Sequence, residues 1–216
     1  MPPEHRLVPR FAAEPPQEGL PYGRWADRLK QELAAAFLEV DGEGEDLGEP
    51  GEVVWYPDRS WYGRTWLPAT SRTSTGFDLF GFVMWVVPED EGEEPAELIA
   101  RADFSNQLAE DNPDWAMDLC DEEVGSWRGE DGEEAEMTLV WGRPMVPGGA
   151  VATAELHDVT VDQCDLADGR FTLLAPDDYR GDKLEIALWD GAHRELARES
   201  LYVEDEADGD DSGQLR

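Results

Sequence analysis

Residues 76–87, Gly76-Phe77-Asp78-Leu79-Phe80-Gly81-Phe82-Val83-Met84-Trp85-Val86-Val87, are the longest apolar run of the sequence and decide which fold it can take. The run is shorter than the roughly 20 apolar residues that a membrane-spanning helix needs. Two glycines and Asp78 argue against a buried helix, because a glycine costs about 1 kcal/mol relative to alanine inside a helix. Aromatic and β-branched residues favour a strand, which Pro88 ends. The run therefore predicts a long central strand that is buried on both faces toward Val87 and has neighbouring strands along both edges.

The second half of the chain has the alternating pattern of antiparallel strands. From Met137 onward, apolar and polar residues alternate in short runs that are separated by turn signals, among which Asp168-Gly169 is typical of a tight hairpin. Short strands with turns roughly every 8–12 residues are typical of an antiparallel sandwich. Residues 169–173 and 184–188 are similar to strands of immunoglobulin-like and carboxypeptidase-regulatory-like modules, a similarity that covers these strands alone and identifies no family.

An amphipathic helix is expected between Arg24 and Val40, ahead of the strands. The apolar residues that recur there at helical spacing are Trp25, Leu29, Leu33, Ala36, Phe37 and Val40. A single apolar stripe favours docking on a sheet of the same fold. The sequence therefore predicts a mainly β protein: an antiparallel β-sandwich, immunoglobulin-like or jelly-roll-like, with one N-terminal amphipathic helix and flexible acidic termini.

The chain is expected to divide into an arm, a domain and a tail. Residues 1–22 carry six prolines, which exclude a helix or a central strand and indicate an extended arm. Residues 23–203 are expected to form the helix and the sandwich, with a candidate internal boundary near residues 130–136, where acidic residues and a glycine gather. Residues 204–216 are expected to be an acidic, disordered tail.

The net charge of −34 is the most unusual property of the sequence: 51 aspartates and glutamates stand against 17 lysines and arginines. One interpretation is that the organism's environment or the composition of its genome favours acidic residues in general, since surface charge concerns solubility more than fold. A second is a basic partner protein or bound cations, and a third is mimicry of a nucleic acid's phosphate surface. Direct binding to nucleic acid is disfavoured, because phosphate contacts need clustered lysines and arginines.

Other features of the sequence suggest a cytoplasmic protein that contacts no membrane. No apolar segment follows the first residues in the way of a secretory signal. Cys120 and Cys164 are too few for a disulfide framework or a zinc site, and free buried thiols are expected. Two acidic stretches, residues 41–52 and 208–213, resemble a calcium-binding loop only in part, because the first lacks the glycine at its sixth position and the second lacks the final glutamate. We expect no metal and no cofactor.

Motifs of catalysis are absent from the sequence. His5, His157 and His193 lie in no recognisable catalytic pattern, and the sequence has no zinc-protease, serine-hydrolase, phosphate-loop or dinucleotide motif. A glycosidase needs only two suitably separated carboxylates, so that class stays open. We expect a protein that is not an enzyme.

The most distinctive candidate site is an aromatic hairpin at residues 55–66. The residues singled out as candidate partner-binding residues are Trp55, Tyr56, Arg59, Trp61, Tyr62 and Arg64. Aromatic residues and arginine are enriched at protein interfaces, and aromatic faces with nearby arginines and carboxylates also suit a sugar. A third interpretation is that the rings pack a small core. Trp61, which adjoins the turn, is expected to be more exposed than Trp66, which adjoins Leu67.

The function that the sequence favours is a non-catalytic protein-interaction or assembly module, which binds a partner protein through this hairpin. The alternative is a carbohydrate-binding module or a carboxylate-based glycoside hydrolase. A further alternative is an acidic mimic of nucleic acid.

Overall fold

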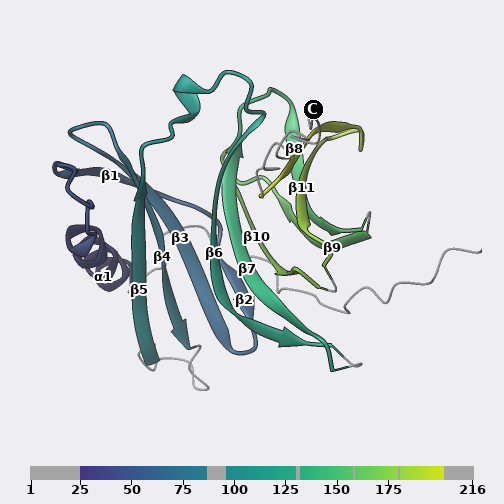
Figure 1. The fold of residues 1–216 in the computed structure, drawn as a ribbon, viewed down its shortest axis with the longest axis horizontal. Helices are drawn as coiled ribbons and strands as arrows, with labels where there is room; N and C mark the ends of the chain where they lie inside the picture. The colour runs from purple at the N-terminus through teal and green to yellow at the C-terminus, as the bar shows by residue number, and fades with distance from the viewer. Residues whose placement is uncertain (1–24, 87–95, 130–131, 158, 180, 202–216) are drawn as a thin grey trace, which may run out of the picture.

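The computed structural model describes residues 25–86, 96–129, 132–157, 159–179 and 181–201. Over these residues the chain has one α-helix and three antiparallel sheets, which lie in successive layers (Figure 1). The prediction of a mainly β, antiparallel sandwich with one helix near its N-terminus is therefore confirmed. The number of sheets exceeds the two of an immunoglobulin-like sandwich. The predicted arm at residues 1–22 and the predicted tail at 204–216 lie outside the described residues.

The first sheet, sheet A, is built around the run that opens the sequence analysis. Its strands are β1 (Pro50–Trp55), β2 (Arg59–Trp61), β3 (Arg64–Thr73), β4 (Asp78–Val86) and β5 (Ala96–Ser105). The strand order is β1-β3-β4-β5, and the short β2 pairs with the beginning of β3. Strand β4 lies between β3 and β5 and pairs with both along most of its length. The predicted central strand with neighbours on both edges is thus confirmed.

Side chains of β4 alternate between two different cores, as the period of a strand requires. Leu79, Val83 and Trp85 belong to the core on the helix side, whereas Phe82 belongs to the core on the opposite side. This arrangement explains why the strand is apolar at nearly every position, since each face meets another layer.

The helix α1 (Ala26–Glu39) covers one face of sheet A (Figure 1). Its buried residues are Leu29, Leu33 and Phe37, and Trp25 and Val40 are partly buried against the same core. These residues all belong to the predicted apolar stripe. The stripe therefore docks on the sheet of the same chain, as its spacing indicates.

Sheet B is the middle layer of the three sheets. It contains β6 (Met117–Arg128), β7 (Glu134–Pro144) and β10 (Phe171–Asp177) in the order β10-β7-β6, and a short 3₁₀ helix, η2 (Ala109–Asp111), lies on the connection from β5 to β6. Strands β6 and β7 pair from Met117↔Pro144 to Arg128↔Glu134. Residues 130–131, within the candidate boundary near 130–136, are outside the described part, and β6 and β7 on either side of them pair with each other in one sheet.

Both faces of sheet B are covered along β7 and β10. Met137, Leu139, Trp141 and Leu174 pack against Trp66 and Phe82 of sheet A in one core. Val140, Phe171, Leu173 and Ala175 face the other way, into the core shared with sheet C. Every residue of β10 is buried, which is the pattern of a strand with a layer on each side.

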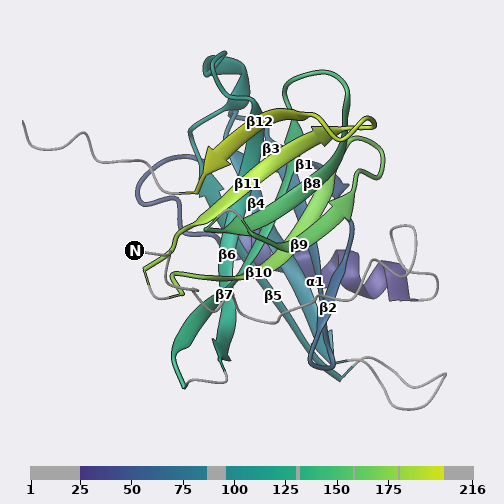
Figure 2. The same ribbon diagram turned by 90° about the vertical axis from the view of Figure 1, so that its right-hand side faces the viewer.

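Sheet C is the outer layer and contains β8 (Gly149–Leu156), β9 (Val159–Asp165), β11 (Leu184–Asp190) and β12 (Glu195–Ser200) in the order β12-β11-β8-β9. Figure 2 views the molecule from this side. Asp168 and Gly169 have φ angles of 50° and 73°, and Ala167 and Arg170 form the bridge of a tight turn around them. The predicted turn is present, but β9 and β10 on its two sides belong to different sheets. The turn therefore carries the chain from the outer layer to the middle one.

A buried ion pair connects sheet A to sheet C. Nη2 of Arg59, in β2, lies 3.1 Å from Oδ1 of Asp162 in β9, and the two side chains are only 2% and 6% exposed. The same guanidinium donates to the carbonyl of Gln163. The other oxygen of Asp162 accepts the backbone N–H of Leu174 in β10 at 2.9 Å, so this one carboxylate joins all three sheets. Burial raises the pKa of Asp162, and the charge of Arg59 opposes that rise.

Two further features of the described residues bear on the sequence analysis. Cys120 is partly buried and Cys164 is buried, and both are free thiols, as expected. Among the described residues, no helix is long and apolar enough to cross a membrane.

Trp61 and Trp66 lie on the paired strands β2 and β3 and differ in burial as the sequence predicts: Trp66 is 2% exposed, and Trp61 is only partly buried. We expect Trp66→Ala to lower the free energy of unfolding by about 3–5 kcal/mol, because it leaves a cavity between sheets A and B. Trp61→Ala should lower it by about 1 kcal/mol. Chemical denaturation of both variants checks this difference. Equal losses would show that Trp61 is as much a part of the core as Trp66.

The ion pair gives a second prediction. Arg59→Met should lower the free energy of unfolding by about 3–5 kcal/mol, because it leaves the Asp162 carboxylate buried without its main charge partner. Adding Asp162→Asn to that variant should restore part of the loss, since the amide oxygen still accepts the Leu174 N–H and no unpaired charge remains. Denaturation of the single and double variants measures both steps. A double variant less stable than Arg59→Met would contradict the assignment of the loss to unpaired charge.

Candidate functional site

The structure separates the six residues of the aromatic hairpin rather than gathering them on one surface. Trp55 is partly buried on the helix side of sheet A. Tyr56 is 5% exposed and belongs to the core between sheets A and B. Arg59 is 2% exposed and takes part in the ion pair with Asp162. Tyr56 and Arg59 therefore lie inside the fold, where a partner protein does not reach them.

The other three residues, Trp61, Tyr62 and Arg64, form the tip of the hairpin between β2 and β3. Tyr62 and Gly63 make a two-residue turn with φ angles of 53° and 74°, and Trp61 pairs with Arg64 across it. Positive φ at both positions is the conformation of the tight turn that matches the twist of paired strands. Glycine adopts it freely, whereas tyrosine does so at a conformational cost of order 1–3 kcal/mol.

The tip presents aromatic surface to solvent. Tyr62 is 85% exposed, the largest exposed fraction among the large apolar side chains of the described residues. Its ring lies 5.9 Å from the ring of Trp61, centroid to centroid. Arg64 is exposed beside them. Two interactions hold the base of the hairpin in place. The hydroxyls of Ser60 and Thr65 form a hydrogen bond of 2.7 Å, and Arg64 pairs with Val86 of β4.

A cleft of about 550 Å³ lies at the other end of β3, between sheets A and B. Sheet A contributes Arg72 and Phe80 to its lining, sheet B contributes Cys120 and Arg143, and Tyr56 lies just after β1. Glu110 of η2 and Trp115, on the connection from β5 to β6, also line it. Along β3, Arg72 is eight residues from Arg64, which places the Cα atoms of these two arginines about 26 Å apart. The volume is within the range of roughly 300–1,000 Å³ that is typical of small-molecule sites.

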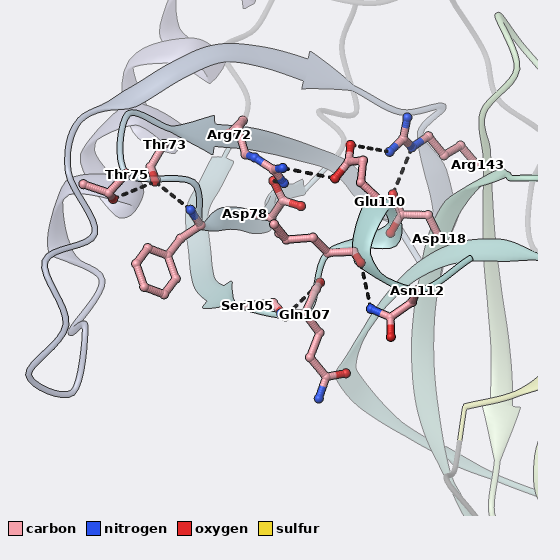
Figure 3. Close-up of polar contacts among 12 residues, drawn as sticks. Arg72, Thr73, Thr75, Asp78, Ser105, Gln107, Glu110, Asn112, Asp118 and Arg143 are labelled. Carbon is pink, nitrogen blue, oxygen red and sulfur yellow. Dashed lines mark hydrogen bonds and ion pairs between the residues drawn. The ribbon is translucent and has the colours of Figure 1, made fainter. Parts of the chain in front are cut away.

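Charged side chains from both sheets form a connected network at the cleft. Arg72 bonds Asp78 at 2.8 Å and Glu110 at 3.0 Å. Arg143 bonds Asp118 at 2.9 Å and lies 3.9 Å from Glu110. Figure 3 shows Glu110 between the two arginines, one from sheet A and one from sheet B. The bond to Arg72 lowers the pKa of Glu110, so this carboxylate is ionised at neutral pH.

Deeper groups of the cleft stay neutral. Burial raises the pKa of Tyr56 to about 12, although a side-chain bond to Thr70 works in the opposite direction. Burial also raises the pKa of the Cys120 thiol far above its ordinary value, with Asp118 adding to the rise. A thiol with a raised pKa is a poor nucleophile, because the thiolate is the reactive form. The phenol therefore offers a hydrogen-bonding hydroxyl, while Cys120 is a weak nucleophile.

Sequence reasoning did not identify this cleft. Arg72 and Asp78 are only six positions apart and pair across the turn between β3 and β4, but Glu110, Asp118 and Arg143 come from three later elements. In a chain with 51 acidic residues, no local pattern distinguishes the carboxylates that bond these arginines. The one feature of the sequence that could have pointed to the cleft is that Arg72 and Arg143 each lie near the C-terminal end of a strand, β3 and β7. Within the described residues, no group of three or more potential ligands has the arrangement of a metal site.

Comparison with protein-family models, with curated proteins and with solved structures finds no match to this chain.

Proposed function

We propose that the chain is a non-catalytic protein-interaction module, which contacts a partner protein through Trp61, Tyr62 and Arg64 of the hairpin tip. The observation that carries the proposal is the placement of Tyr62. Its ring is 85% exposed, and its backbone has a φ of 53°, which tyrosine adopts only at a cost. Neither packing nor turn formation calls for a tyrosine at this position, since asparagine or aspartate would make the same turn more favourably.

The composition of the tip supports a protein partner. Tyrosine, tryptophan and arginine are the residues that most often carry the binding energy of protein interfaces. The turn and the paired strands hold the tip before binding, so little conformational entropy is lost when a partner docks. Trp61 supports Tyr62 from the side, at 5.9 Å between ring centroids, while it is itself anchored against the core between sheets A and B.

The charge of the chain indicates what kind of protein this partner is. A net charge of −34 attracts a basic surface over distances longer than any single contact. In such a complex the aromatic tip provides short-range binding energy and the acidic surface raises the rate of association. A basic partner protein is therefore the partner we propose.

Carbohydrate binding is the second candidate function, and the inter-sheet cleft favours it more than the hairpin does. At the hairpin, Arg59 would have supplied hydrogen bonds to sugar hydroxyls, but it is engaged with Asp162 inside the fold. The cleft combines aromatic rings with arginines and carboxylates from two sheets.

We expect Tyr62→Ala to weaken binding of the partner by about 2 kcal/mol or more, the loss typical of an interface anchor, while the melting temperature stays within a few degrees of the wild type. Partners captured from lysate by the wild-type chain are identified by mass spectrometry. Their affinity for the wild-type chain and the variant is then measured with purified proteins. Leu38→Ala is the matched control, because Leu38 is 75% exposed on α1, far along the chain from the tip.

Equal loss of binding in Tyr62→Ala and Leu38→Ala would mean that capture reflects general apolar contact. Retention of the same partners by Tyr62→Ala would place the interface elsewhere. Binding should also weaken as salt is raised from about 0.01 M to 1 M, since screening shortens from about 30 Å to about 3 Å. A partner that binds equally at both concentrations is not recognised through the acidic surface.

A further inference from the structure

We propose that the cleft between sheets A and B binds a neutral oligosaccharide. This is a second binding site, independent of the hairpin tip. The juxtaposition behind it is two aromatic rings, Phe80 and Trp115, beside an ion-paired network of arginines and carboxylates in one cleft of about 550 Å³.

The charge balance of the cleft favours a neutral ligand. Three arginines (Arg72, Arg143 and Arg170) line it together with four carboxylates (Asp78, Glu110, Asp118 and Asp121), so the lining has no excess of positive charge, although Arg170 donates to the Trp55 carbonyl rather than to a carboxylate. Arg72 and Arg143 each bond at least one carboxylate at 3.0 Å or less, so neither offers an unmatched charge to an anion. The same bonds engage Asp78, Glu110 and Asp118, so these carboxylates do not form a cation site. A ligand without net charge leaves this network intact.

The network nevertheless retains hydrogen-bonding capacity. A guanidinium has five N–H donors, and the hydrogen bonds of Arg72 to Asp78 and Glu110 use two of them. Each carboxylate oxygen accepts more than one bond. The side chains of Arg72 and Arg143 are 43% and 45% exposed, so a ligand in the cleft reaches them. The ion-paired guanidiniums and carboxylates place hydrogen-bond donors and acceptors side by side. This arrangement suits the hydroxyls of a sugar ring, because each hydroxyl both donates and accepts a hydrogen bond.

The apolar part of the lining suits the other face of a sugar. The C–H face of a pyranose ring packs on an aromatic ring, and Trp115, which is partly exposed, offers such a surface at the cleft. The buried hydroxyl of Tyr56 is neutral and adds a further donor and acceptor at the base of the cleft. Lysine, a compact point charge that suits phosphate or carboxylate better, is absent from the lining of this cleft.

A second hollow argues for more than one sugar unit. It has a volume of about 210 Å³, shares Phe80 with the cleft and includes Arg101, Glu122 and Trp141 in its lining. The indole Nε1 of Trp141 is buried and has no hydrogen-bond partner among the described residues. An acceptor that reached it from the hollow would satisfy a donor that the fold leaves unbonded. The two hollows together suit a short linear chain of sugars.

The test is a glycan array that carries neutral, sialylated and sulfated oligosaccharides, probed with the full chain. Titration of the best neutral hit follows, with the indole N–H resonance of Trp115 as reporter. That resonance is assigned by its disappearance in Trp115→Phe. We expect a neutral oligosaccharide to bind and to shift the Trp115 resonance. Trp115→Ala should weaken the affinity by about tenfold or more. Arg143→Lys, which keeps the charge but loses the planar fork, should weaken it by a smaller factor.

Tyr62→Ala and Leu38→Ala are the controls, and both should bind the sugar as the wild type does, whatever they do to a protein partner. Thermal unfolding of each variant separates lost binding from lost fold, and the shift of the Trp115 resonance in the wild type needs no variant at all. The proposal is overturned if only anionic glycans bind. It is also overturned if no neutral glycan shifts the resonance at up to about 10 mM, ten times the Kd of about 1 mM that marks weak binding.

Discussion

The constraint on which the rest of the structure depends is that β7 and β10 of sheet B are covered by another sheet on each of their two faces. Strands β7 and β10 place Leu139, Trp141 and Leu174 against sheet A, and Val140 and Leu173 against sheet C. Each fully buried side chain of this size contributes roughly 1.5–3 kcal/mol when it leaves water. Neither face of sheet B is stable without its neighbouring sheet, so the three sheets form one stack. The buried Asp162 carboxylate of sheet C also connects the three sheets, because it forms an ion pair with Arg59 of sheet A and accepts a hydrogen bond from the Leu174 N–H of sheet B.

This stack positions the two candidate sites. Strand β3 carries Arg64 of the hairpin tip at one end and Arg72 of the cleft at the other, and its middle is buried between the helix and sheet B. The tip lies at one end of sheet A, whereas the cleft is lined by residues near the other end of β3, by sheet B and by η2 and its connection. The arginines of both sites lie on strands, so they are held before any ligand arrives. Glu110 and Trp115 of the cleft lie on the connection from β5 to β6. A protein partner at the tip and a sugar in the cleft would not compete for space.

The sequence predicts those parts of the fold that depend on local periodicity. The run at 76–87 indicates a strand buried on both faces, the stripe from Trp25 to Val40 indicates the helix, and Asp168-Gly169 indicates a tight turn. Features set by contacts between distant residues were not predictable. The sequence made Arg59 a candidate partner-binding residue because its neighbours are aromatic. Its ion-pair partner, Asp162, is 103 residues away in the sequence, so only the folded structure brings the two together. The cleft depends likewise on Arg72, Glu110 and Arg143, which the stacking of two sheets brings together.

The central claim is that sheet B unites the molecule into one cooperative unit, and native-state hydrogen exchange tests it most directly. The account predicts that the slowest amides of β4 in sheet A, β7 in sheet B and β11 in sheet C share one opening free energy, equal to that of global unfolding by denaturant. Amides at the ends of the outer strands should exchange faster through local fraying. Two separate plateaus, with β11 opening while β4 and β7 stay protected, would contradict the account. They would show that sheet C unfolds separately from sheets A and B.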